Sequence, residues 1–74
     1  MKDIKGMKVM RIKFKKDASV DFHSIRLHEW IDHTFQKGET IEGHVITNGR
    51  WSDITLSNGD LAESVRNDSF EILG

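Results

Sequence analysis

The chain has 74 residues with no cysteine and no proline, and 36% of its residues are hydrophobic. These values leave room for one small domain and exclude disulfides and thiolate metal sites. Its longest uncharged apolar stretches have only a few residues, whereas a membrane-spanning helix needs about 20, so we expect no membrane partner. The absence of cysteine favours a reducing cytoplasm.

Charge is distributed unevenly along the chain. The first 16 residues contain seven lysines and arginines against Asp3 alone, a net charge of +6, so the remainder must be −7 to give the overall −1. Such asymmetry indicates a basic contact surface or two complementary surfaces. The simpler alternative is the solvated face of one strand, whose lysines discourage edge-to-edge pairing.

A first strand is predicted over residues 7–14, after a frayed lead-in at 1–6. Met10, Ile12 and Phe14 fall on one face of this strand, and Arg11 and Lys13 fall on the other, which is the period of two expected for β-structure. The polar residues 15–19 then break the pattern and predict a turn.

Residues 20–36 match two templates imperfectly. Read as a strand, the segment has one face made of Ile25, Leu27, Glu29, Ile31, His33 and Phe35. Read as a helix capped by Ser24, it forms a stripe of Leu27, Trp30, Ile31 and Thr34, and Gly38 lies where a C-terminal cap belongs. We expect a short helix or an irregular insertion, so that residues 15–37 form a long loop or helix.

Two Asn-Gly pairs organise residues 39–65. Asn48-Gly49 and Asn58-Gly59 each separate alternating apolar runs, and this is the strongest short-range hairpin signal because a type I′ turn needs positive φ at both central residues. The pattern predicts a three-stranded meander over 40–47, 50–56 and 61–65. Gly43, inside the first of these strands, predicts a tight bend.

The pattern from Gly38 onward resembles the SH3-like small barrels, a group that includes KOW and Tudor barrels. The resemblance is carried by Gly38-Glu39-x-Ile41-x-Gly43-x-Val45, by Ile54-x-Leu56-x-Asn58-Gly59-Asp60 and by Val65-x-x-Asp68-x-Phe70-Glu71-Ile72-Leu73. It implies one mainly β domain over 1–74, a barrel of about five antiparallel strands from 7–14 and 38–73 with the insertion at 20–36. The group includes nucleic-acid binders, peptide binders and subunits of assemblies, so the resemblance implies architecture more than function.

Metal binding and catalysis have little support. The segment 28–33 is similar to a zinc-protease motif, but its histidines are five residues apart and would diverge by about 140° on a helix. Helical spacing would instead pair His28 with Asp32 and Glu29 with His33, as ordinary surface ion pairs do. The serines lack a glycine elbow, and so small a domain rarely encloses a catalytic pocket. We therefore expect no metal, no cofactor and no enzymatic activity.

Protein recognition is the function that we predict. Trp51 follows the turn at Asn48-Gly49-Arg50 and has the opposite parity to Ile54 and Leu56, which favours an outward position. The alternative for both Trp30 and Trp51 is a place in the core. Exposed tryptophan beside arginine is typical of interface hot spots. The predicted partner-binding residues, which would engage a larger protein or protein assembly, are Arg50, Trp51, Asp53 and Trp30.

The alternative is a nucleic-acid-binding module that uses the basic first strand. Its cations would neutralise phosphates, while exposed tryptophans would stack on bases. The acidic remainder of the chain opposes this reading. The residues that would bind nucleic acid are Lys8, Arg11, Lys13, Lys15 and Lys16.

Small, charge-rich chains without cysteine or proline also resemble bacteriophage products. That resemblance implies a protein that binds and inhibits or redirects a host machine, such as the transcription apparatus, in the host cytoplasm. The chain begins at Met1 and has no obvious tag, so we expect a complete gene product.

Overall fold

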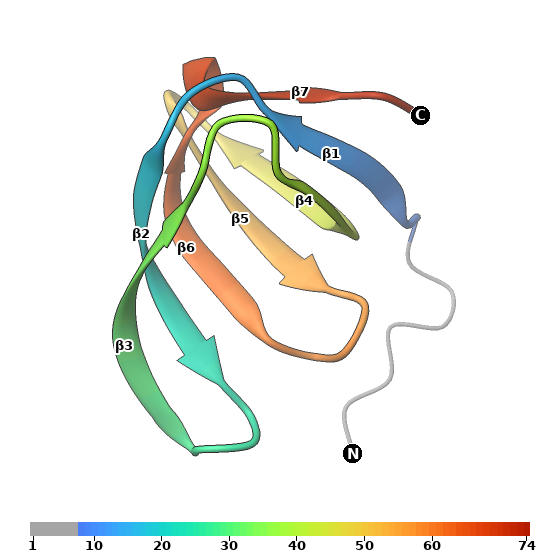
Figure 1. Ribbon diagram of the computed structural model, residues 1–74. Helices are drawn as coiled ribbons and strands as arrows, with labels where there is room; N and C mark the ends of the chain where they lie inside the picture. The colour runs from blue at the N-terminus through green and yellow to red at the C-terminus, as the bar shows by residue number, and fades with distance from the viewer. Residues whose placement is uncertain (1–7) are drawn as a thin grey trace.

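Seven β-strands and one turn of 3₁₀ helix make up the computed structural model, which describes residues 8–74 (Figure 1). In chain order they are β1 (Met10–Phe14), β2 (Ala18–Ser24), β3 (Glu29–Phe35), β4 (Thr40–Asn48), β5 (Trp51–Leu56), β6 (Leu61–Arg66), η1 (Asn67–Ser69) and β7 (Phe70–Ile72). The mainly β class is confirmed, whereas the expected count of about five strands was too low. The frayed lead-in expected at 1–6 lies outside the described residues.

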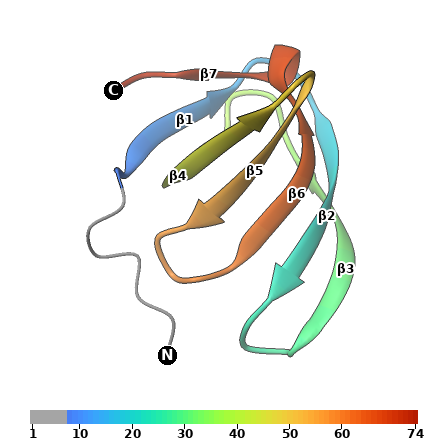
Figure 2. The ribbon, with the colours of Figure 1, turned by 180° about the vertical axis from the view of Figure 1, so that it is seen from behind.

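All seven strands belong to one antiparallel sheet with the order β3-β2-β6-β5-β4-β1-β7. β1 is inserted between two strands that come later in the chain, because Ile12 lies opposite Ile41 on β4 and opposite Ile72 on β7. β3 and β7 are therefore the two edge strands. Figure 2 shows the same order from behind.

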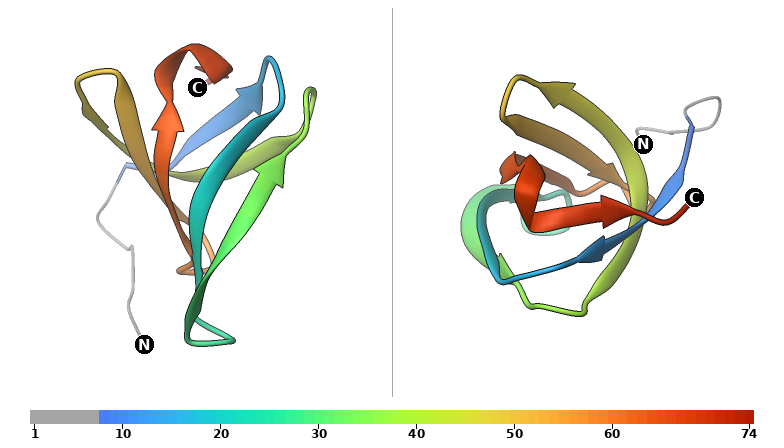
Figure 3. Two further views of the ribbon diagram at one scale, coloured as in Figure 1. Left: turned by 90° about the vertical axis from the view of Figure 1, so that its left-hand side faces the viewer. Right: turned by 90° about the horizontal axis from the view of Figure 1, so that it is seen from above.

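The sheet is strongly curved, and the core lies on its concave face (Figure 3). Phe14 on β1 stacks on Phe35 at the end of β3, with ring centroids 4.5 Å apart, although four strands lie between β1 and β3 in the sheet order. Phe70 packs against Phe14 at 6.1 Å. Burying each of these rings stabilises the fold by about 2–3 kcal/mol. The buried apolar residues are Ile12, Phe14, Ala18, Val20, Phe35, Ile54, Ala62, Val65 and Phe70.

Residues 20–36 form most of a β-hairpin, so the helix or irregular insertion expected there was wrong. β2 and β3 pair residue for residue, from Ala18 opposite Phe35 to Ser24 opposite Glu29. The alternating pattern of a strand places every second side chain on the core face. The helical stripe fails because Leu27 and Trp30 are exposed by 57% and 52%.

Ser24 caps a single turn at the tip of this hairpin, not a helix. Its carbonyl oxygen accepts the N–H of His28 at 2.8 Å, and its hydroxyl oxygen accepts the N–H of Leu27 at 3.2 Å. Asp60, from the loop between β5 and β6, accepts the N–H of Ile25 at 3.1 Å. The capping signal in the sequence was therefore real, but the chain reverses after one turn.

Both Asn-Gly pairs lie in hairpin turns, as predicted, but neither turn is type I′. In the first, paired Asn48 and Trp51 leave Gly49 and Arg50 as central residues, and only Gly49 has positive φ, at 68°. That is the pattern of a type II′ turn. In the second, Gly59 (φ 98°) ends a three-residue loop in which a left-handed residue follows a tight turn.

Gly43 allows β5 to approach β4 closely. It lies opposite Met10 on β1 and opposite Leu56 on β5. A Cβ atom at this position would lie 2.5 Å from the carbonyl oxygen of Thr55 and 3.1 Å from Cγ2 of Ile54. Only glycine fits there without a shift of the backbone of β5.

Candidate protein-binding surface

Three carboxylates lie side by side on three adjacent strands. Asp21 on β2 is directly opposite Asp32 on β3 and directly opposite Glu63 on β6. Residues paired in this way point to the same face of a sheet. That face is the convex one, because the adjoining residues Val20 and Ala62 are buried in the core. A row of negative charge therefore crosses the outer surface.

A β-bulge in β6 extends this row toward β5. The register shifts between Ser52 and Ile54, so that Glu63 and Ser64 together face Asp53. Ser64 accommodates the extra residue with a φ of 62°, which is uncommon for a residue other than glycine. Because the bulge adds one residue, the residues before and after it can both point to the core, and Ala62 and Val65 are both buried. Asp53, a predicted site residue, lies at the end of the row.

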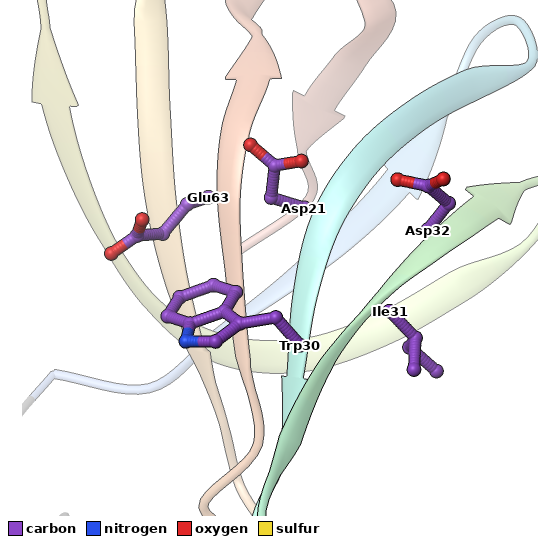
Figure 4. A pocket seen from close by; sticks show the side chains of 5 residues that line it. All are labelled: Asp21, Trp30, Ile31, Asp32 and Glu63. Carbon is purple, nitrogen blue, oxygen red and sulfur yellow. The ribbon is translucent and has the colours of Figure 1, made fainter.

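Trp30 lies at one end of the row. It pairs with His23 on β2, with ring centroids 5.0 Å apart, and remains 52% exposed. Its indole reaches across β2 toward the side where Asp21 and Glu63 lie (Figure 4). These three residues, with Ile31 and Asp32, line an open hollow of about 580 Å³.

Trp51 lies at the other end, 47% exposed. It pairs with Arg66 on β6, whose guanidinium carbon is 5.6 Å from the ring centroid, a cation–π contact that orients the indole. Trp51 lines a second hollow, of about 420 Å³, together with Asp21 and Asp32. The two hollows share both aspartates, so the surface is continuous. We call it the acidic face; its members are Trp30, Asp32, Asp21, Glu63 and Trp51.

The predicted partner-binding residues are brought together in part. Trp30, Trp51 and Asp53 all lie on the convex side of the sheet, within or beside the acidic face. Arg50 is in the turn before β5 and lines a different hollow, next to Asp68. We therefore place Arg50 at the margin of the acidic face.

Two basic residues of the alternative site lie opposite carboxylates on neighbouring strands. Arg11 is directly opposite Glu42 on β4, and Lys13 is directly opposite Glu71 on β7. Each pair places opposite charges on one face, which is favourable between strands. The exposed side chains that form this group, which we call the basic strand, are Lys8, Arg11, Lys13, Lys15 and Lys16.

Lys16 has its own carboxylate partner. Its Nζ lies 3.5 Å from Oδ2 of Asp68, and Nε of Arg66 lies 3.3 Å from Oδ1 of the same residue. The slight desolvation of Asp68 acts to raise its pKa, but the hydrogen bond from Arg66 and the positive charges of Arg66 and Lys16 outweigh it, so the pKa is lowered. The positive charge of Lys16 is thus partly compensated.

Sequence reasoning missed Asp21 and Glu63, and considered Asp32 only as one half of a helical pair. It missed Asp21 because residues 20–36 were expected to form a short helix or an irregular insertion, and neither would align Asp21 with Asp32. The available signal was the period-two alternation of the apolar residues Val20 and Phe22 with the polar residue between them, Asp21. Even with two strands assigned, the pairing of β2 with β6 has no local marker in the sequence.

Neither a metal-binding cluster nor a membrane-spanning helix is found among residues 8–74. No group of three or more histidine, aspartate or glutamate side chains there is arranged to hold a metal ion. Because 29–35 is a strand, residues four apart, such as Glu29 and His33, are about 13 Å apart along it and do not share one helical turn. No helix in this part of the chain is long and apolar enough to cross a membrane.

Comparisons with protein-family models, with curated proteins and with solved structures found no match for this chain.

Proposed function

We propose that this protein is a non-catalytic binding module whose acidic face docks on a basic surface of a larger protein. One observation carries the proposal: two half-exposed tryptophans, Trp30 and Trp51, lie at either end of a continuous row of carboxylates. No lysine or arginine is among the described residues that line its two hollows.

Tryptophans in this setting are suited to anchoring a partner. A buried interface tryptophan often contributes 2 kcal/mol or more, on the order of the largest single-residue effects in interfaces. The indoles of Trp30 and Trp51 contact His23 and Arg66, which reduces the side-chain freedom that would be lost on binding.

The carboxylate row supplies orientation and selectivity. Like charges directly opposite each other on adjacent strands are destabilising, so Asp21, Asp32 and Glu63 reduce the stability of the free protein. A basic partner would relieve this repulsion and would be attracted from a distance. The arrangement is therefore more favourable in a complex than in the free chain.

The SH3-like barrel remains our proposal for the architecture. It is supported by the strong curvature of the sheet, by the contact between Phe14 and Phe35, and by the close approach at Gly43. The hairpin β2–β3 lies in the position where the sequence predicted the insertion.

The resemblance to bacteriophage products suggests the kind of target. We propose a nucleic-acid-handling machine of a host cell, such as the transcription apparatus, in the cytoplasm. Such assemblies carry many basic surfaces.

The test is capture of partners from a bacterial lysate by the immobilised chain, with and without nuclease. Wild type should retain a protein that survives nuclease, and the double variant Trp30→Ala, Trp51→Ala should lose it while melting within a few degrees of wild type. Leu73→Ala is the matched control, because Leu73 is also about half exposed (51%) but lies away from the acidic face. Retention that depends on nucleic acid, or that is unchanged in the double variant, would contradict the proposal.

A further inference from the structure

The edge of β3 is open along its whole length. Among residues 8–74 β3 pairs only with β2, and it is the terminal strand of the sheet. Every second residue of an edge strand directs its N–H and C=O groups away from its partner. β3 has seven residues, Glu29–Phe35, and pairs on one side only among the described residues, so several of these groups point away from the sheet.

This edge is long and regular, and the charges it carries, on Glu29 and Asp32, are both negative. Natural edge strands are shortened, bulged, or protected by lysine or proline. β3 has neither lysine nor proline, and its pairing with β2 runs without a register shift. The opposite edge, β7, differs because it has only three residues.

The side chains of β3 present two different surfaces to an added strand. Trp30 and Asp32 point to the convex side and belong to the acidic face. Ile31 and His33 point to the concave side and are only partly buried. An added strand would therefore meet a negative, aromatic surface on one face and a partly apolar surface on the other.

From these features we propose that the partner engages by adding an extended segment to the edge of β3, with lysine or arginine and apolar residues in alternation. This inference rests on the proposed function and specifies its mode. Residues opposite each other on paired strands are about 5 Å apart. The basic side chains of the added segment would then lie beside Asp32 and over the indole of Trp30, while its apolar side chains would cover Ile31.

A second copy of this chain fits the edge less well. Antiparallel pairing of two β3 edges centred on Asp32 would bring this carboxylate directly against the same carboxylate of the other copy. Like charges on facing strands oppose such pairing. Charge therefore selects a basic segment from another protein over self-association.

The test uses the intact chain and synthetic peptides as long as β3, which has seven residues. The probe alternates lysine and valine; one control alternates glutamate and valine, and a second is the fully N-methylated lysine–valine peptide, which keeps its charge but has no amide donors. Amide hydrogen exchange and NMR shifts are followed residue by residue. We expect the probe to protect β3 amides that exchange rapidly in the free protein. The N-methylated peptide should bind about tenfold more weakly, as the loss of two or three hydrogen bonds implies.

Variants then test the side-chain contacts. Asp32→Asn and Trp30→Ala should each weaken the probe by about threefold or more. Glu71→Gln is the matched control, since it removes a carboxylate from β7, the other edge strand, and should leave the affinity unchanged.

Several outcomes would overturn the inference. These are absence of probe binding at millimolar concentration, equal binding of the glutamate peptide or of the N-methylated peptide, and dimerisation through β3 without any peptide. Equal binding of the N-methylated peptide, with shifts confined to the acidic face, would remove strand addition but leave the proposed function standing. If the probe protects β3 but capture from the lysate is unchanged in the double tryptophan variant, strand addition stands and the proposed function is contradicted.

Discussion

The acidic face and the basic strand lie toward opposite ends of the strand order, and their charges are arranged in opposite ways. Arg11 and Lys13 are close together in the sequence, yet each faces a carboxylate, Glu42 or Glu71, on a neighbouring strand. The members of the acidic face come from four different strands and gather without a compensating lysine among the described residues that line its hollows. A cluster of charge along a strand is thus no guide to a cluster in space, because the register with neighbouring strands decides what each side chain faces.

The largest effect is expected at Gly43, where β4 joins the strands of the acidic face to β1. Gly43→Val should lower the free energy of unfolding by about 3 kcal/mol or more, because its side chain would overlap the carbonyl of Thr55. Urea denaturation measures this. Thr40→Val, an exposed position on the same strand, is the control and should change stability by less than about 0.5 kcal/mol. If Gly43→Val changes the free energy of unfolding as little as the control does, the fold does not depend on the close approach of Gly43 to Thr55.

Neutralising the acidic face should stabilise the free protein. The triple variant Asp21→Asn, Asp32→Asn, Glu63→Gln removes two directly opposed like-charge contacts and should raise the free energy of unfolding by about 1 kcal/mol at low salt. Added salt should narrow the difference from wild type, because it screens the repulsion. Denaturation at low and high salt tests both points. A loss of stability would mean that these carboxylates make compensating contacts in the free chain.

The same kind of change beside the basic strand should have the opposite sign. Glu42→Gln with Glu71→Gln removes the carboxylates facing Arg11 and Lys13, and should lower stability by about 0.5 kcal/mol. It should also expose the basic strand, so that a fluorescent oligonucleotide gives an anisotropy change at low salt that wild type gives weakly or not at all. If wild type already binds as tightly as the variant, the carboxylates do not mask this strand.

The smallest effect is expected at Asp68. Its pKa is lowered from the ordinary 3.8 in the folded state, so its stabilising contribution is fully present above that value and is lost as the pH falls through the folded-state pKa. Asp68→Asn should therefore reduce the melting temperature slightly at neutral pH and should have no effect once the pH is well below 3.8. A difference that persists in acid would indicate a role for Asp68 other than its charge.

The sequence predicted the elements whose signals are local. The period-two pattern around Met10, Ile12 and Phe14 located β1, and the two Asn-Gly pairs located the hairpins of β4, β5 and β6. It failed at 20–36, because Ser24 and Gly38 are also typical of helix ends, and a short capped turn has the same first residues as a capped helix. Parity favoured an outward Trp51 over a place in the core, and Trp51 is about half exposed.

What the sequence determined by itself was the mainly β class, most of the strands and the outward direction of Trp51, since alternation and turn chemistry act over a few residues. What only the tertiary structure decided was which strands became neighbours. The pairing of β2 with β6 and the bulge at Ser64 bring Asp21, Asp32 and Glu63 into one row between two tryptophans. That arrangement depends on how the sheet curves to bury Phe14 against Phe35, and the packing of residues so far apart in the chain leaves no mark in the local pattern.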